Sequence, residues 1–307
     1  MYDLIGDIHG HADELEQLLD ILEYRKINGV YRHPERQLIF LGDFIDRGPK
    51  IRQVLEIVRP MVEERAALAV MGNHELNALG YHTEDPESPG QYLRRRNPTN
   101  QKQHQQTLDQ LTPTELRFYL EWFRKLPMWL ELDGLRAVHA CWDDRSMSLI
   151  AAAVDPQCGL TPDLLQSACR PRKALFHPVE TVLKGKEVAL PDGVSFEDKD
   201  GHVRTRTRVR WYVSPEHHTY RSYALTNLID SDLELDRTVI QEAAPYPSTA
   251  KPVFIGHYWL NEKRPELLAE NVACLDFSVA KGGFLCGYRW RGEQKLSNDN
   301  FVWKDRP

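Results

Sequence analysis

Leu41-Gly42-Asp43-Phe44-Ile45-Asp46-Arg47-Gly48 follows an apolar run that begins at Gln37. That run has strand length, and the apolar spacing after Pro49 is helical, so the stretch joins a strand to a helix. Asp43 then stands at the carboxyl end of a strand, where the sheets of α/β proteins collect their ligands. Carboxylate oxygens suit divalent cations, and an arginine offers a planar fork to phosphate oxygens. The composition predicts a metal and phosphate site.

Two other predicted strands end in residues of the same chemical kind. Residues 1–7 form an apolar run that ends in Asp7-Ile8-His9-Gly10, and residues 67–71 form one that precedes Gly72-Asn73-His74-Glu75. Asp43 follows Asp7 by 36 positions and precedes Asn73 by 30, close to the roughly 30-residue length of a βαβ unit. Parallel neighbouring strands would bring these loops to one sheet edge. Two later strand-like runs, 135–138 and 252–256, lead into His139 and His257.

The ordered set of five motifs resembles the calcineurin-like metallophosphoesterases, in particular their bacterial phosphoprotein-phosphatase branch, which includes serine/threonine phosphatases and diadenosine tetraphosphatase-like proteins. The motifs are Asp7-x-His9, Gly42-Asp43-x-x-Asp46-Arg47-Gly48, Gly72-Asn73-His74-Glu75, His139 and Gly256-His257. The resemblance covers residues 1–141 and about 252–288. It implies an α/β fold with a two-sheet β-sandwich flanked by helices. One position departs from the pattern, because Cys141 stands where relatives tend to carry a glycine.

The resemblance also implies roles for individual residues. The first of two metals would be held by Asp7, His9 and Asp43, and the second by Asp43, Asn73, His139 and His257. Asp43 would bridge the two ions. His74 with Asp46 corresponds to the family's acid pair beside the leaving group, and Arg47 corresponds to one of its phosphate clamps.

The chemistry of two close cations explains these residue types. Two cations about 3.5–4 Å apart can share a hydroxide, lower its pKa and brace both oxygens of an in-line displacement. Mixed Asp, His and Asn ligands suit manganese, iron or zinc, and we expect Mn²⁺ first. The leading prediction is therefore a dinuclear metal-dependent phosphatase that hydrolyses phosphomonoesters, in phosphoproteins or small molecules, by a metal-bridging hydroxide.

Length and composition favour one soluble catalytic domain. The 307 residues alone would suggest two domains, but the site residues run from Asp7 to His257 and tie both ends together. We expect a single domain, 1–307, with an insertion at about 143–250. Hydrophobic residues make up 41% and charged residues 27%, values typical of soluble globular proteins. The net charge of −6 gives no basic surface for an obligate nucleic-acid partner.

The sequence shows neither a leader peptide nor a long apolar segment, so we expect a cytoplasmic protein without a membrane partner. Disulfides and a zinc finger are disfavoured, because the cysteines are odd in number and lack a Cys-x-x-Cys pair. They are Cys141, Cys158, Cys169, Cys274 and Cys286. Nothing in the sequence indicates the oligomeric state.

Between the fourth and fifth motifs lies a predicted arginine-rich strand, 202–213. Its alternation places four arginines on one face: Arg204, Arg206, Arg208 and Arg210. This face is either a charged strand edge or a substrate-binding surface. The stretch Thr207-Arg208-Val209-Arg210-Trp211 resembles the Thr-Arg-x-Arg-aromatic stretch of bacterial symmetrical diadenosine tetraphosphate hydrolases. Dinucleoside polyphosphate hydrolysis is therefore the alternative function, with Arg208 or Arg210 as second phosphate clamp.

A third hypothesis, a non-catalytic metal-binding interaction module, is disfavoured because a scaffold has no use for the acid pair or for Arg47. Residues 83–107 are predicted to form a loop or partly helical insertion. Its run Arg94-Arg95-Arg96 is better explained as a solvated face than as a steering patch for polyanions.

Other helices and one carboxylate complete the sequence-based predictions. A helix from 51 to 64 is expected to kink at Pro60, and one from 115 to 126 should turn Phe118, Tyr119 and Trp122 towards the core. Asp276 is better explained as a turn residue than as a partner of the His257 ring.

Overall fold

The computed structural model describes residues 1–154, 159–197, 201–225 and 228–304. Its larger sheet has the strand order β14-β15-β1-β4-β5, with β16 added beside β15. These strands are β1 (Tyr2–Ile5), β4 (Gln37–Phe40), β5 (Ala67–Ala69), β14 (Asp276–Phe277), β15 (Phe284–Trp290) and β16 (Phe301–Trp303). Strand β4 pairs in parallel with both β1 and β5, so the first three motif loops leave the sheet at one edge, as the spacing predicted.

The smaller sheet has the order β13-β12-β7-β6 and carries the last two motifs. Its strands are β6 (Trp129–Glu131), β7 (Arg136–Val138), β12 (Val253–Ile255) and β13 (Val272–Cys274). Strand β12 is parallel to β7 and to β13, while β6 and β7 form an antiparallel hairpin. The carboxyl ends of β7 and β12 therefore open in the same direction, towards His139 and His257.

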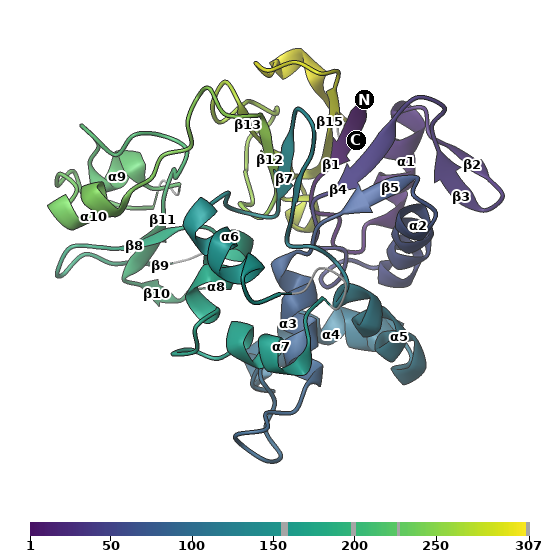
Figure 1. The fold of residues 1–307 in the computed structure, drawn as a ribbon, viewed down its shortest axis with the longest axis horizontal. Coiled ribbons are helices and arrows are strands. Elements are labelled where there is room, and N and C mark those ends of the chain that lie inside the picture. Colours follow the sequence, from purple (N-terminus) through teal and green to yellow (C-terminus); the bar gives the residue numbers. More distant parts are fainter. Residues whose placement is uncertain (155–158, 198–200, 226–227, 305–307) are drawn as a thin grey trace.

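A buried apolar cluster joins the two sheets. It combines Leu4 and Ile39 of the larger sheet with Ala137 and Phe254 of the smaller one. Because these side chains contact one another, the two sheets pack face to face. The predicted two-sheet α/β sandwich is confirmed (Figure 1).

Helices flank the sandwich and contribute a large part of the second, larger cluster of buried apolar side chains. They are α1 (Ala12–Ile21), α2 (Ile51–Glu63), α3 (Asn73–His82), α4 (Pro98–Gln110), α5 (Pro113–Phe123), α6 (Asp144–Ala151), α7 (Pro162–Cys169), α8 (Phe176–Lys184), α9 (Tyr220–Tyr223) and α10 (Arg237–Glu242). In Figure 1, α3, α4, α5 and α7 gather below the sheets, on the side to which the motif loops lead. Helix α2 continues past Pro60 as one element.

One prediction about the helices is confirmed and another needs correction. The segment 83–107 is partly helical: Asn97, whose side chain accepts the Asn100 N–H, starts α4, with Pro98 in the first turn. The correction concerns Phe118, which is 50% exposed. Its ring lies beneath the Arg59 guanidinium, 3.7 Å from the ring centroid, so a cation–π contact replaces the expected core packing.

The predicted single strand 202–213 is wrong. It divides into β10 (Val203–Arg204), which pairs with β9 (Phe196–Glu197), and β11 (Arg206–Arg208), which pairs with β8 (Glu187–Ala189). The pairing partner changes at Thr205, whose carbonyl accepts the Leu190 N–H. A small hairpin of β2 (Arg25–Ile27) and β3 (Val30–Arg32) and two 3₁₀ turns, Val279–Lys281 and Asn298–Asn300, complete the described elements.

None of the described helices has both the length and the apolar character that crossing a membrane requires. The four cysteines within the described residues carry free thiols, and Cys158 lies outside that part of the chain.

Candidate active site

Asp43 is the centre of the candidate site. Its Oδ2 lies 3.5 Å from His9 Nε2, 3.5 Å from His139 Nε2 and 3.9 Å from His74 Nε2. These four side chains come from loops after β1, β4, β5 and β7, and all are buried. The convergence of strand ends therefore gathers the predicted ligand types around one carboxylate.

Two groups of potential metal ligands share Asp43. His9, Asp43 and His74 form one group, and Asp7, Asp43 and His139 form the other, with the ligand atoms of each group within 4.8 Å of one another. A carboxylate common to both groups can offer one oxygen to each of two ions. The assignment of each residue to a particular ion stays a prediction.

Asn73 and His257 extend the second group. Asn73 Oδ1 lies 3.2 Å from His139 Nε2 and 2.6 Å from His257 Nδ1. The backbone N–H of His257 donates to both oxygens of Asp7, at 3.2 and 3.0 Å. All six predicted metal ligands are thus linked by direct contacts.

Backbone carbonyls orient two of the histidines. His9 Nδ1 donates to the Ile45 carbonyl at 2.9 Å, and His139 Nδ1 donates to the Leu41 carbonyl at 2.7 Å. With Nδ1 protonated, each Nε2 lone pair faces Asp43. Among the described residues His9 Nε2 has no hydrogen-bond partner although it is buried. A bound cation would satisfy this nitrogen, so the donor set fits a metal centre.

Burial dominates the electrostatics of the centre. It raises the pKa of Asp7 well above its ordinary value, and the neighbouring charges of Asp276 and Asp43 add to the rise. Burial, helped by the charge of His74, lowers the pKa of His9 to about 3. At His139 burial lowers the pKa, but the charges of Asp43 and Asp7 outweigh it and raise the pKa to about 10. Buried carboxylates that repel one another form a site that favours a divalent cation.

The motif glycines give the ligands room. A Cβ on Gly72 would lie 2.2 Å from Asp43 Oδ1, and a Cβ on Gly256 would lie 2.0 Å from Asp7 Oδ1. The ligands also have unusual backbone: φ is 45° at His9, 52° at Asp43 and 70° at His257. Such left-handed conformations cost free energy and persist where surrounding contacts enforce them, which is common at functional sites.

Glu75 holds two motif loops together, a role that sequence reasoning missed. Its Oε2 accepts the N–H groups of Asp43 at 2.8 Å and Gly72 at 3.0 Å, while its Oε1 accepts that of Phe44 at 2.8 Å. The side chain is fully buried. Its position two residues after Asn73 could have indicated this role, because a carboxylate buried beside the site must accept hydrogen bonds from several donors.

The predicted acid pair is present as a contact. His74 Nδ1 donates to Asp46 Oδ2 at 2.6 Å. The other oxygen, Asp46 Oδ1, accepts His104 Nδ1 at 2.7 Å and the Thr107 hydroxyl at 2.5 Å. Burial raises the pKa of Asp46, but the hydrogen bonds from His104 and His74 outweigh it and hold the pKa below its ordinary value. His104 and Thr107 were not predicted, although their i, i+3 spacing places them on one face of α4.

Arg47 is exposed beside the centre. Its guanidinium carbon lies 4.4 Å from the Trp259 ring centroid, and that ring lies 5.6 Å from the His9 ring. Asp276 anchors this loop, since its Oδ2 accepts the Trp259 N–H at 2.7 Å and its Oδ1 accepts the Ser278 N–H at 3.0 Å. Both contacts are to backbone, as the turn interpretation of Asp276 expects.

The two candidate second clamps have different surroundings. Arg208 is half-buried, and its charge helps burial to lower the pKa of His257. Arg210 is exposed, and its backbone N–H donates to the Tyr223 carbonyl. At the positions that alternate with the arginines, Val203 is 66% exposed, whereas Thr207, Val209 and Trp211 are buried. Of these two arginines, Arg208 is the one whose charge lowers the pKa of His257.

Comparisons with known proteins find a phosphoesterase family model, tetraphosphatases and phosphatases. A model of the calcineurin-like phosphoesterase family matches residues 2–164. The bis(5'-nucleosyl)-tetraphosphatase PrpE [asymmetrical] of Oceanobacillus iheyensis is 47% identical over 73 residues, which are 24% of this chain and 29% of that protein. Its namesake from Halalkalibacterium halodurans is 47% identical over 74 residues, again 24% of this chain and 30% of that protein.

Among solved structures, a cold-active protein-tyrosine phosphatase of a psychrophilic Shewanella superposes with a TM-score of 0.51 at 18% identity. That match covers 94% of this chain and 75% of the phosphatase. At such low identity the likeness concerns the fold.

Proposed function

The chain belongs to the calcineurin-like phosphoesterase family, and on that premise we propose that it is a metal-dependent hydrolase of phosphoric esters or anhydrides. The observation that carries the proposal is the position of Asp43, which belongs to both groups of potential ligands. The site residues come from both ends of the chain, which supports one catalytic domain, 1–307, with the region 143–250 as an insertion.

The centre is proposed to hold two divalent cations, with Mn²⁺ as the first candidate and iron or zinc as the others. Asp7, His9, Asp43, Asn73, His139 and His257 would hold them. When bound, such a pair polarises a phosphoryl group and activates water as the nucleophile. The chain supplies a dry surrounding, because all six side chains are buried.

The residues beside the centre act on the substrate. Arg47, held over Trp259, binds non-bridging phosphate oxygens through its guanidinium fork. Arg208 is proposed as the second clamp, since its charge acts on the His257 side of the centre. His74, fixed at Nδ1 by Asp46, presents Nε2 towards Asp43 and can give a proton to a leaving oxygen from that atom.

Dinucleoside polyphosphates are the substrate class that we propose. The support is the 47% identity with a bis(5'-nucleosyl)-tetraphosphatase, together with the Thr207–Trp211 stretch. Because the matched segment spans 29% of that relative, its activity comes to this chain only as a proposal.

Phosphomonoesters are the second candidate, favoured by the His74–Asp46 contact. An alkoxide is a poor leaving group and needs a proton in the transition state, whereas a leaving phosphate does not. A residue placed to give that proton is most useful on an ester.

A substrate panel tests the proposal. The purified protein with Mn²⁺ is assayed on diadenosine tetraphosphate, p-nitrophenyl phosphate and phosphopeptides, and nucleotide products are separated by chromatography. We expect the highest kcat/KM for diadenosine tetraphosphate. A higher value for phosphopeptides would replace it with the phosphomonoester function. No turnover of any of the three, by protein that binds Mn²⁺, would favour an interaction module.

A further inference from the structure

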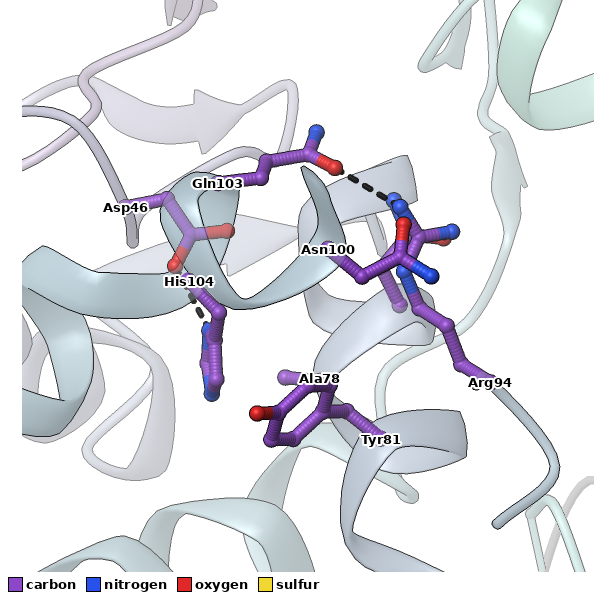
Figure 2. A pocket seen from close by; sticks show the side chains of 8 residues that line it. Asp46, Ala78, Tyr81, Arg94, Asn100, Gln103 and His104 are labelled. Carbon is purple, nitrogen blue, oxygen red and sulfur yellow. Dashed lines mark hydrogen bonds and ion pairs between the residues drawn. The ribbon is translucent and has the colours of Figure 1, made fainter. Parts of the chain in front are cut away.

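A cavity lies beside the leaving-group side of the site. It holds about 170 Å³ of empty space including its open mouth, and its walls come from α3 and α4 together with Asp46 and Arg94. Figure 2 shows Gln103 and Asn100 of α4 opposite the Arg94 side chain, with Asp46 and His104 at the other end. The site described above uses Asp46 but leaves the rest of this cavity without a role.

Arg94 reaches into the cavity without an acidic partner. Its Nη1 donates to Asn77 Oδ1 at 2.8 Å and its Nη2 donates to Gln103 Oε1 at 2.7 Å, both neutral acceptors. Within the described part of the chain no carboxylate lies within ion-pair distance of it. Burial lowers its pKa, and the more distant charges of Asp46 and Glu180 offset this only in part. A partly buried guanidinium that forms no ion pair attracts an anion.

Asp46 acts on Arg94 only through its charge and accepts no hydrogen bond from it. Both of its oxygens are occupied, Oδ2 by His74 and Oδ1 by His104 and Thr107. Its charge is therefore already stabilised by three donors, and the cation at the other end of the cavity is left for a ligand.

The neighbouring arginines differ from Arg94. Arg96 stacks on the Tyr92 ring, 3.3 Å from its centroid, and its Nε donates to the Tyr81 carbonyl. Arg95 is exposed. The prediction of a solvated face is therefore correct for Arg95, whereas the Arg94 side chain points into the cavity.

A short series of contacts connects Arg94 to the centre. His74 Nε2 lies 3.9 Å from Asp43 Oδ2, and the amide Nε2 of Gln103 lies 3.4 Å from the same His74 nitrogen. The Gln103 amide oxygen then accepts from Arg94. Gln103 thus lies between His74 and Arg94. It is a flexible side chain that a phosphate oxygen can replace on Arg94.

We propose that Arg94 and Gln103 form a subsite for an anionic leaving group, the phosphate of a nucleotide released from a phosphoanhydride. This inference rests on the proposed function. In that hydrolysis water forms the new bond to the attacked phosphorus, and the bond from phosphorus to the bridging oxygen breaks. The leaving phosphate keeps the electron pair, and the proton lost by water passes to solvent. Arg94 lies where the added negative charge develops.

Binding of two stable analogues tests the subsite directly. Methylphosphonate fills only the position at the metal ligands, whereas methylenediphosphonate, in which carbon replaces the bridging oxygen, also reaches Arg94. Titration calorimetry on Mn²⁺-loaded protein should show Arg94→Gln weakening methylenediphosphonate about 10- to 100-fold, the loss of one charge-assisted contact. The loss for methylphosphonate should be smaller by about a factor of ten.

Arg95→Gln is the matched control, because it removes the same charge from the next, exposed position and should change neither affinity. Arg94→Lys keeps the cation without the fork and should lose an intermediate factor, which keeps the test usable if Arg94→Gln does not fold. Equal weakening of both analogues would overturn the subsite, and so would no weakening of either. A wild type that hydrolyses no phosphate compound would remove the proposed function, yet the calorimetric comparison would still decide the subsite.

Discussion

At the scale of the residue, His74 has one nitrogen fixed and the other facing the reaction centre. Its Nδ1 contact with Asp46 at 2.6 Å is supported on the far side by His104 and Thr107. The orientation of the ring therefore depends on residues from α4 as well as on its own motif. Such support is what keeps a proton donor aligned with a leaving oxygen.

Replacement of His74 should affect substrates according to their leaving group. His74→Asn is expected to lose about 10²–10⁴-fold in kcat on an alkyl phosphate, whose alkoxide needs a proton, and much less on p-nitrophenyl phosphate, whose phenolate leaves unaided. Rates measured over a series of leaving groups check this. Equal losses along the series would exclude the acid role.

Arg208 and Arg210 should differ in their effect on turnover. Arg208→Ala is expected to lower kcat/KM for diadenosine tetraphosphate by about 10- to 150-fold, because one charge-assisted phosphate contact is lost. Arg210→Ala should lose far less, since its side chain is exposed, whereas Arg208 is half-buried and its charge lowers the pKa of His257. Steady-state kinetics of the two variants test this. A larger loss of kcat/KM for Arg210→Ala than for Arg208→Ala would make Arg210 the clamp.

At the scale of the element, the loops after β4 and β5 are joined through one side chain. Glu75, in the first turn of α3, accepts N–H groups from both loops and so fixes the position of Asp43. Strand pairing brings the loops to one sheet edge, but this carboxylate sets their relative position at atomic detail.

Removal of Glu75 should destabilise the protein even without metal. Glu75→Ala leaves three buried N–H groups unpaired, at about 1–3 kcal/mol each, so the free energy of unfolding should fall by about 3 kcal/mol or more. Urea unfolding in the presence of a chelator measures this without any contribution from bound metal. Glu56→Ala, at an exposed position of α2, is the control and should stay within about 0.5 kcal/mol of wild type. If Glu75→Ala also changed the free energy of unfolding by no more than about 0.5 kcal/mol, the three N–H groups would have found other partners.

At the scale of the whole molecule, the centre unites loops from two sheets. Asp7, Asp43 and Asn73 follow strands of the larger sheet, while His139 and His257 follow strands of the smaller one. The core cluster between the sheets therefore determines how the two sets of candidate metal ligands lie relative to each other. Metal binding and packing of the sandwich should stabilise each other.

Metal content should reveal the bridge. Wild-type protein is expected to bind two divalent ions, and Asp43→Ala should lose both more readily than Asn73→Ala loses one, because a bridging carboxylate serves two ions. Elemental analysis after dialysis gives the stoichiometry of each variant. One ion in the wild type, with no change on replacing Asp43, would contradict the two-metal centre.

The sequence by itself indicated which residues gather around Asp43 and that three of the strands carrying them are parallel neighbours. Asp7, Asp43 and Asn73 could be located because each follows a local apolar run, and a run of strand length indicates a strand end wherever it lies in the chain. The roughly 30-residue spacing then implied parallel neighbours, which β1, β4 and β5 confirm.

Only the tertiary structure decided the contacts that join distant segments. Glu75 across two loops, His104 behind Asp46 and the inward turn of Arg94 depend on how α3 and α4 pack, and no local pattern encodes that packing. The predicted strand 202–213 was wrong for the same reason, since its alternation was correct in part but its pairing partners change at Thr205. Local chemistry and periodicity are determined by neighbouring residues, whereas strand pairing and burial depend on the whole chain.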